Sequence, residues 1–218
     1  MLQYHHYIQL LALIVGVSTM KKDWQPQFKI ILVLTFISLL IELTGRYINF
    51  YYRESNHWLY NIYTPIQGFL TLLIFLKFTT ILRVKSIINR LIIFFIVSHF
   101  LSYYFHQEFF KLNNYAVILS LVCNCIAASL FYYDVMANDV QTQLLKQPGF
   151  WFATGVFFMS VIFICRFAFW NIIIGYAGYK TIFPYIVNAA NTFLYGGFIA
   201  TFVCQNFYNT NQKHYLRS

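Results

Sequence analysis

The chain has 218 residues, of which 60% are apolar, 22% aromatic and only 10% charged, and its mean hydropathy is +0.60. This composition excludes a soluble domain, which carries far more surface charge, and indicates that lipid is the solvent. The formal net charge of +9 does not indicate nucleic-acid binding, because the basic residues fall in short connections between apolar segments.

The apolar residues are grouped into long segments separated by short polar connections. Seven segments can be counted: 4–20, 29–52, 58–81, 90–109, 114–136, 150–173 and 181–208. A helix needs about 20 apolar residues to cross a hydrocarbon core about 30 Å thick. We therefore predict an all-α polytopic membrane protein, with seven transmembrane helices in a single domain over residues 1–218.

The Lys and Arg residues divide unequally between the two sets of connections. Ten of the fifteen fall on one side: Lys21, Lys22, Lys29, Lys77, Arg83, Lys85, Arg90, Lys146, Lys213 and Arg217. Three fall on the other side: Arg53, Lys111 and Lys180. Because positive residues accumulate in cytoplasmic loops, we predict an outside N-terminus and a cytoplasmic C-terminus, in a cell membrane such as a bacterial inner membrane.

The segment 29–52 carries a polar stripe. Its polar residues are spaced by three or four positions and so share one helix face: Thr35, Ser38, Glu42, Arg46 and Asn49. An ionisable residue at mid-helix costs roughly 2.5–3.5 kcal/mol on insertion scales, and Glu42 and Arg46, four apart, partly neutralise each other. We predict that this stripe faces other helices or a wet cavity.

The next segments continue the pattern. In segment 58–81 one face carries Asn61, Thr64, Gly68 and Thr71. Pro65 is expected to kink this helix and to free a backbone carbonyl that needs another partner. The stretch RVKSIINR at 83–90 is predicted to be a cytoplasmic loop. In segment 90–109 one face carries Phe95, His99, Ser102 and His106, with Tyr103 beside it.

The C-terminal part adds three features. Segment 114–136 is predicted to continue as a helix into the cytosol, so the loop 134–149 is the expected contact for a cytoplasmic protein partner. Segment 150–173 carries Arg166. In segment 181–208 one face carries Pro184, Asn188, Asn191, Tyr195 and Phe198. Gly196 and Gly197 favour a close approach of another helix.

With this topology, polar side chains of five segments lie at similar depth in the outer half of the bilayer. We predict a net-cationic pocket there, in which Arg46 and Arg166 bind an anionic group. The predicted ligand-binding residues are Glu42, Arg46, Asn49, Asn61, His99, Tyr103, Arg166, Asn188, Asn191 and Tyr195. Structural alternatives remain: interhelical hydrogen bonds, snorkelling of Arg166 and an intrahelical Glu42–Arg46 pair.

The sequence predicts no catalytic residue, metal or cofactor. His99 and His106 share a face, but the metal-binding patterns HExxH and CxxC are absent. His5, His6 and His57 are read as interface residues, and whether the outer histidines bind a metal is left open.

Two short stretches carry a resemblance: ELTGRY at 42–47 and NHWLYNIYTPIQ at 56–67. Both resemble a stretch of small, uncharacterised bacterial seven-helix integral membrane proteins. The resemblance implies the seven-helix fold and no known activity, so it assigns no residue a role.

These observations favour an integral membrane ligand-binding or sensory module, which recognises a small anionic or amphipathic molecule and has membrane lipids around it. The alternative is a small-solute or ion transporter with Glu42 as the coupling carboxylate. An enzyme with Glu42 or His99 as general base ranks below both, because no second carboxylate or nucleophile–base spacing supports it. A structural subunit of a larger complex is the fourth possibility.

Overall fold

The computed structural model describes residues 4–21, 24–53, 55–105, 110–137, 144–169 and 179–215. These residues are helical throughout, apart from short connections, and contain no strand. The helices are α1 (Tyr4–Thr19), α2 (Pro26–Tyr47), the π-helical turn η1 (Ile48–Tyr52), α3 (His57–Phe78), α4 (Leu82–Phe105), α5 (Asn114–Ala137), α6 (Pro148–Ala168) and α8 (Tyr179–Tyr215). The predicted all-α class is therefore confirmed.

Six of the described helices are long and apolar enough to cross a bilayer: α2 with η1, α3, α4, α5, α6 and α8. The remaining helix, α1, has only 16 residues. At 1.5 Å per residue it is about 24 Å long, shorter than the hydrocarbon core of about 30 Å. The chain is a multi-pass helical membrane protein, and the predicted seventh span stays a prediction.

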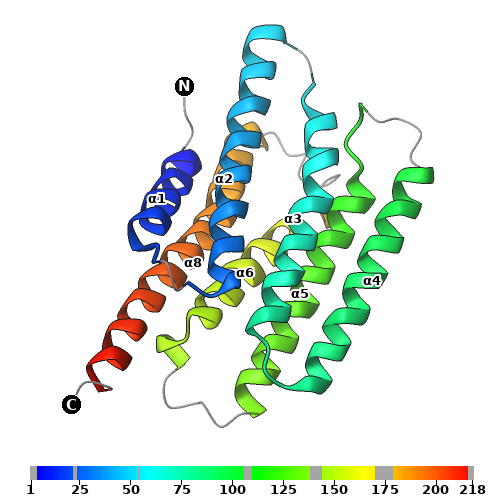
Figure 1. Cartoon of the computed structure of the whole chain (residues 1–218). Helices are drawn as coiled ribbons and strands as arrows, with labels where there is room; N and C mark the ends of the chain where they lie inside the picture. Colours follow the sequence, from blue (N-terminus) through cyan, green and yellow to red (C-terminus); the bar gives the residue numbers. More distant parts are fainter. Residues whose placement is uncertain are drawn as a thin grey trace.

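The helices form a ring with one helix outside it (Figure 1). Around the ring α1, α2, α3, α5, α6 and α8 each pack against the next, and α8 packs against α1. The helix α4 packs on the outside, against α3 and α5. The first turn of α1 and the last turn of α8 lie at opposite ends of the bundle (Figure 1). Because α4 is outside the ring, its side chains meet α3 and α5 rather than the centre of the ring.

One prediction about the connections is wrong. The stretch 83–90 forms the first turns of α4 instead of a loop. Val84 and Ile88, four residues apart, are buried against the bundle, while Arg83 and Arg90 are exposed. The basic residues therefore occupy the solvent-facing side of a helix, and their density hid its apolar stripe.

The start of α4 is capped by a carboxylate from another helix. Asp134, on α5, is only 2% exposed. It accepts hydrogen bonds from the backbone N–H groups of Thr80 at 3.0 Å and Ile81 at 2.7 Å, and from the Thr80 hydroxyl at 3.1 Å. An acidic group at a helix N-terminus satisfies amides that have no partner within the helix. Asp134 thereby ties α5 to the connection between α3 and α4.

The helices α6 and α8 approach each other through glycines. A Cβ atom added at Gly197 would lie 2.7 Å from the Trp151 backbone oxygen and 2.9 Å from the Gly155 Cα atom. The same addition at Gly196 would meet nothing within 4 Å. The predicted close approach is confirmed at Gly197, with Gly155 as its partner, and is wrong for Gly196.

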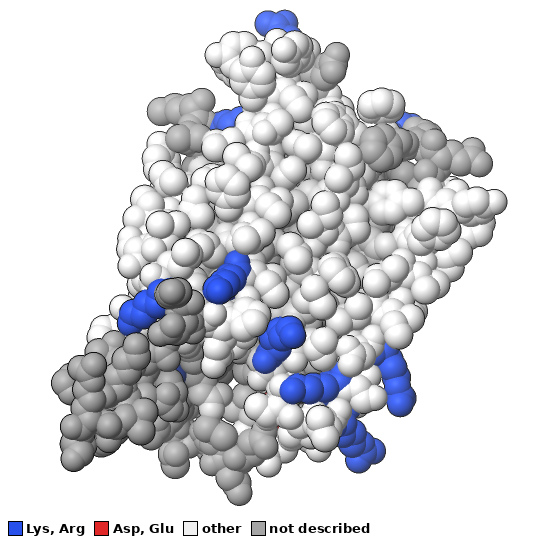
Figure 2. All heavy atoms as spheres, in the orientation of Figure 1, with Lys and Arg blue, Asp and Glu red and all other residues white. Residues whose placement is uncertain are grey.

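The two halves of the bundle are filled differently. The half in which α3 ends is packed with fully buried aromatic rings: Phe28, Phe75, Phe152, Phe198 and Phe202. Lys and Arg side chains gather at this end on the face drawn in Figure 2, on which no acidic side chain is visible. We call it the basic end. The opposite end, where α2 ends and α3 begins, we call the cavity end.

Candidate functional site

The helix ring encloses a cavity of about 500 Å³ in its cavity-end half. Side chains from α1, α2, η1, α3, α5, α6 and α8 line it. Asn56 and His57, at the start of α3, belong to the lining, so the cavity reaches the end of the bundle. Small-molecule sites commonly have volumes of roughly 300–1,000 Å³. The cavity therefore has the size of a site for a small organic molecule.

Half of the ten predicted ligand-binding residues line this cavity. They are Glu42, Asn49, Arg166, Asn191 and Tyr195. Two others lie next to it. Asn188 accepts a hydrogen bond from Nδ1 of His5, a lining residue, at 3.0 Å, and Arg46 follows Glu42 by one turn of α2. The structure thus brings most of the predicted cluster to one place, and their role in binding stays a prediction.

The wall around Glu42 is built from tyrosines. Tyr60, on α3, donates a hydrogen bond to Oε2 of Glu42 at 3.0 Å. Deeper in the bundle, the Tyr63 and Ser38 hydroxyls hydrogen-bond to each other, and Gln9 donates to the Tyr195 hydroxyl at 2.9 Å. These contacts join α1, α2, α3 and α8 below the carboxylate. The Tyr60 hydrogen bond holds the Glu42 carboxylate at the cavity wall.

The opposite wall carries a guanidinium among aromatic rings. The Arg166 Cζ atom lies 4.3 Å from the ring centroid of Phe183, 5.1 Å from that of Phe167 and 5.6 Å from that of Phe163. All four residues line the cavity. A cation over aromatic faces is held electrostatically by the rings. The three rings hold the Arg166 guanidinium at the cavity wall, and its binding of an anion stays a prediction.

One lining residue presents an acceptor that lacks a hydrogen bond. Asn124, on α5, is 3% exposed, and its Oδ1 atom accepts no hydrogen bond from the residues that the structure describes. Buried side-chain oxygens are normally hydrogen-bonded to protein or to ordered water. Asn124 is thus suited to accept a hydrogen bond from a molecule in the cavity. Asn124 is not among the ten predicted ligand-binding residues.

Asn61 and Tyr103, two predicted site residues, instead hold a connection in place. Pro65 lacks the N–H that would bond to the Asn61 carbonyl, and the Tyr103 hydroxyl donates to that carbonyl. The Asn61 side chain donates to the Lys111 carbonyl at 2.8 Å and accepts from the Asn113 N–H at 3.0 Å. The two residues therefore fasten α4 and the start of α5 to α3.

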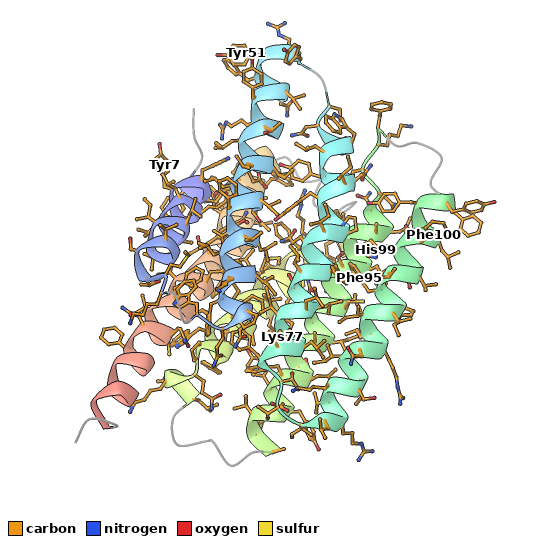
Figure 3. The ribbon with its side chains drawn as sticks, in the orientation of Figure 1. Tyr7, Tyr51, Lys77, Phe95, His99 and Phe100 are labelled. Atoms are coloured by element: carbon orange, nitrogen blue, oxygen red, sulfur yellow. The ribbon has the colours of Figure 1, made fainter. Side chains whose placement is uncertain are left out.

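His99 lies behind the cavity wall. Its Nδ1 donates to the Phe95 carbonyl at 3.0 Å, and its Nε2 accepts from the Ser120 hydroxyl at 3.1 Å. Figure 3 shows Phe95 and His99 on the side of α4 toward its neighbours, whereas Phe100 points away from the bundle. Ser120 lines the cavity, so His99 touches it only through this hydroxyl.

Sequence reasoning missed the first turn of α1. His5 and His6 are 3% and 4% exposed, and they lie beside Glu42. In the sequence the two histidines stand at the beginning of an apolar segment, a position typical of residues at the membrane–water interface. Their register with Gln9, Ala12 and Gly16, all buried on one face of α1, is the pattern that marks them as inward-facing. His106 and residues 138–143 of the predicted partner loop lie outside the described residues.

Comparison of the chain with family models, curated proteins and solved structures finds no match. The resemblance to small bacterial seven-helix proteins therefore stays a prediction. The fold and the cavity define the class: a multi-pass helical membrane protein with a polar, partly charged chamber between its helices.

Proposed function

We propose that this membrane protein binds a small anionic or amphipathic molecule in its central cavity, with the Arg166 guanidinium holding the anionic group. The observation that carries the proposal is the shared chamber: Arg166 on α6 and Glu42 on α2 line the same cavity of about 500 Å³. Ionic interactions are stronger in such a low-dielectric setting than in water. A guanidinium also matches carboxylate and phosphate oxygens in a bidentate manner.

The rest of the lining defines the other end of the ligand. Glu42 and the Asn124 side-chain oxygen are acceptors, and the rings of Phe163, Phe167 and Phe183 supply apolar surface. A molecule with an anionic group, a hydrogen-bond donor and a short apolar part satisfies all of these groups. The proposed ligand therefore carries an ammonium or hydroxyl group in addition to its anionic group.

We propose that the protein lies in a bacterial inner membrane or its equivalent, with the cavity end outside. The gathering of Lys and Arg at the basic end (Figure 2) supports this orientation through the positive-inside rule. Ligand from the extracytoplasmic side then reaches the cavity past Asn56 and His57.

Sensing is the form of function that we favour. A ligand shifts a protein between two helix arrangements only if its affinity for them differs. α5 contributes Asn124 to the cavity wall and Asp134 to the capped connection at the basic end. This continuous helix is the element that we expect to pass a shift to a cytoplasmic partner at 134–149.

Transport is the second candidate, and Glu42 in the cavity is the observation that favours it. The buried aromatic rings at the basic end argue against it, because they block a path from the cavity to the other side. Proton-driven uptake into proteoliposomes, lost in Glu42→Gln, would establish transport. Binding without uptake would support the sensor.

The test of the proposal is binding by the purified protein in lipid nanodiscs. Organic molecules that copurify are identified by mass spectrometry, and hexanoate and glycerol 3-phosphate are titrated as probes. We expect Arg166→Leu to weaken binding about 10- to 100-fold, since a hydrogen bond to a charged group contributes roughly 1.5–3 kcal/mol. Arg83→Leu is the matched control, because Arg83 is exposed at the basic end. Equal affinities of wild type and Arg166→Leu would refute the proposal.

A further inference from the structure

Two histidines and a carboxylate meet where α1 packs against α2. His5 and His6 are adjacent in α1, and their rings stack with centroids 4.1 Å apart and planes inclined by 28°. One ligand atom from each of His5, His6 and Glu42 lies within 4.8 Å of the other two. Tyr7, the next residue, lies on the outer surface of α1 (Figure 3). The first turn of α1 thus directs both imidazoles inward.

Contacts around the cluster orient two of its three side chains, His5 and Glu42. The Asn188 Oδ1 atom is only an acceptor, so the Nδ1 atom of His5, 3.0 Å away, carries the proton. The Nε2 lone pair of His5 is then available to a metal. Tyr60 donates to Oε2 of Glu42 at 3.0 Å, which fixes the carboxylate and leaves Oε1. Hydrogen bonds of this kind accompany most metal-binding histidines and carboxylates.

We propose that His5, His6 and Glu42 bind one divalent transition-metal ion, with Zn²⁺ as its representative. Two imidazoles and one carboxylate form a ligand set typical of zinc sites that keep an open coordination position, and imidazole nitrogen disfavours Ca²⁺ and Mg²⁺. In a tetrahedral zinc site the ligand atoms lie about 3.3 Å apart. The spacing of up to 4.8 Å closes to this value through small side-chain rotations.

The position of the cluster gives the metal a consequence for the cavity. His5 and Glu42 line the cavity, whereas His6 does not. The open coordination position therefore faces the chamber, and Glu42 offsets only one of the two positive charges of the ion. A bound metal also stabilises a carboxylate that is otherwise costly inside a membrane. The metal site goes beyond the proposed anion binding and does not require it.

The experiment measures metal binding by the full chain, purified without a polyhistidine tag and reconstituted in nanodiscs. After chelation and dialysis, Zn²⁺ is titrated by calorimetry, Co²⁺ is titrated for its visible absorption bands, and bound metal is determined by plasma mass spectrometry. We expect about one ion per chain in the wild type. We expect His6→Gln, which removes a ligand without altering the cavity lining, to abolish saturable binding.

Two further variants separate a metal site from a structural cluster. Asn188→Ala leaves all three ligands in place and should weaken Zn²⁺ binding about 10- to 100-fold, as losses of such outer partners do. His57→Gln is the matched control, since His57 lines the same cavity outside the cluster, and it should bind like the wild type. If His6→Gln does not elute as a monodisperse helical protein, the Asn188→Ala result decides.

Absence of saturable Zn²⁺ binding in the wild type would overturn the metal site. An equal loss of Zn²⁺ affinity in the Asn188→Ala and His57→Gln variants would also overturn it. Arg166→Leu distinguishes the two proposals. It should retain Zn²⁺ binding while it loses the anionic probes, so failure of either site is seen separately.

Discussion

The close packing of α6 on α8 predicts opposite effects for the same substitution at neighbouring glycines. Gly197→Ala places a Cβ atom 2.7 Å from the Trp151 carbonyl oxygen. Ordinary contacts begin near 3.4 Å, so the helices must separate locally by about 0.7 Å. The opposing atoms belong to the backbone, and no change of side-chain rotamer relieves them. Gly196→Ala meets nothing within 4 Å.

The magnitudes follow from two opposing terms. Overpacking costs typically 1–3 kcal/mol, and replacing Gly by Ala inside a helix gains about 1 kcal/mol of helix propensity. We expect Gly197→Ala to lower the free energy of unfolding by up to about 2 kcal/mol, and Gly196→Ala to leave it unchanged or raise it by up to about 1 kcal/mol. Equilibrium unfolding in mixed detergent micelles measures both. Equal values for the two variants, or a more stable Gly197→Ala, would refute the inferred helix contact.

Three further substitutions test other contacts. Asp134→Ala should lower the free energy of unfolding by about 1–3 kcal/mol, because it leaves the Thr80 and Ile81 amides before α4 without their acceptor; relative to the wild type, native-state hydrogen exchange should accelerate most at these two amides. Asn61→Ala should lower the thermal stability and leave the affinity for the anionic probes, measured per folded molecule, at the wild-type level, because Asn61 does not line the cavity. A lower affinity would show that Asn61 belongs to the binding site. Asn124→Leu should weaken the binding of a ligand that donates a hydrogen bond by about 3- to 10-fold and leave the free energy of unfolding almost unchanged. Unchanged binding of such a ligand would contradict the role given to the Asn124 amide oxygen.

Periodicity identified the helices, but it did not determine which helices are neighbours. Polar residues at similar depth on five segments were expected to share one pocket. His99 and Tyr103 do not line it, because α4 packs outside the ring. Depth in a bilayer follows from sequence position, whereas position around a bundle depends on packing that a single sequence does not reveal. Asn61 does not line the cavity for a local reason: its backbone carbonyl, freed by Pro65, accepts a hydrogen bond from Tyr103 on the α4 side.

The polar face of α3 was predicted in part. Thr64 and Gly68 of the expected face line the cavity, whereas Asn61 and Thr71 do not. Tyr60, Tyr63 and Gln67 also line it, and neighbouring residues of a helix point only 100° apart. Tyr60 and Tyr63 were not counted among the polar residues of this helix, which hid the hydroxyls that hydrogen-bond to Glu42 and to Ser38. In a membrane helix the phenol hydroxyl needs a partner, so a tyrosine facing other helices is better read as polar.

α1, the shortest α-helix among the described residues, contributes His5 to the cavity wall. α1 packs between α2 and α8, and its inward face carries His5, His6, Gln9, Ala12 and Gly16. Ala12 and Gly16 are small and admit a close approach, while the three polar residues meet Glu42, Asn188 and Tyr195. A helix of 16 residues gains little from spanning lipid, so its position depends on this face. Polar and small residues at three- and four-residue spacing in a short apolar segment therefore indicate a helix held by contacts with the bundle interior rather than by the bilayer.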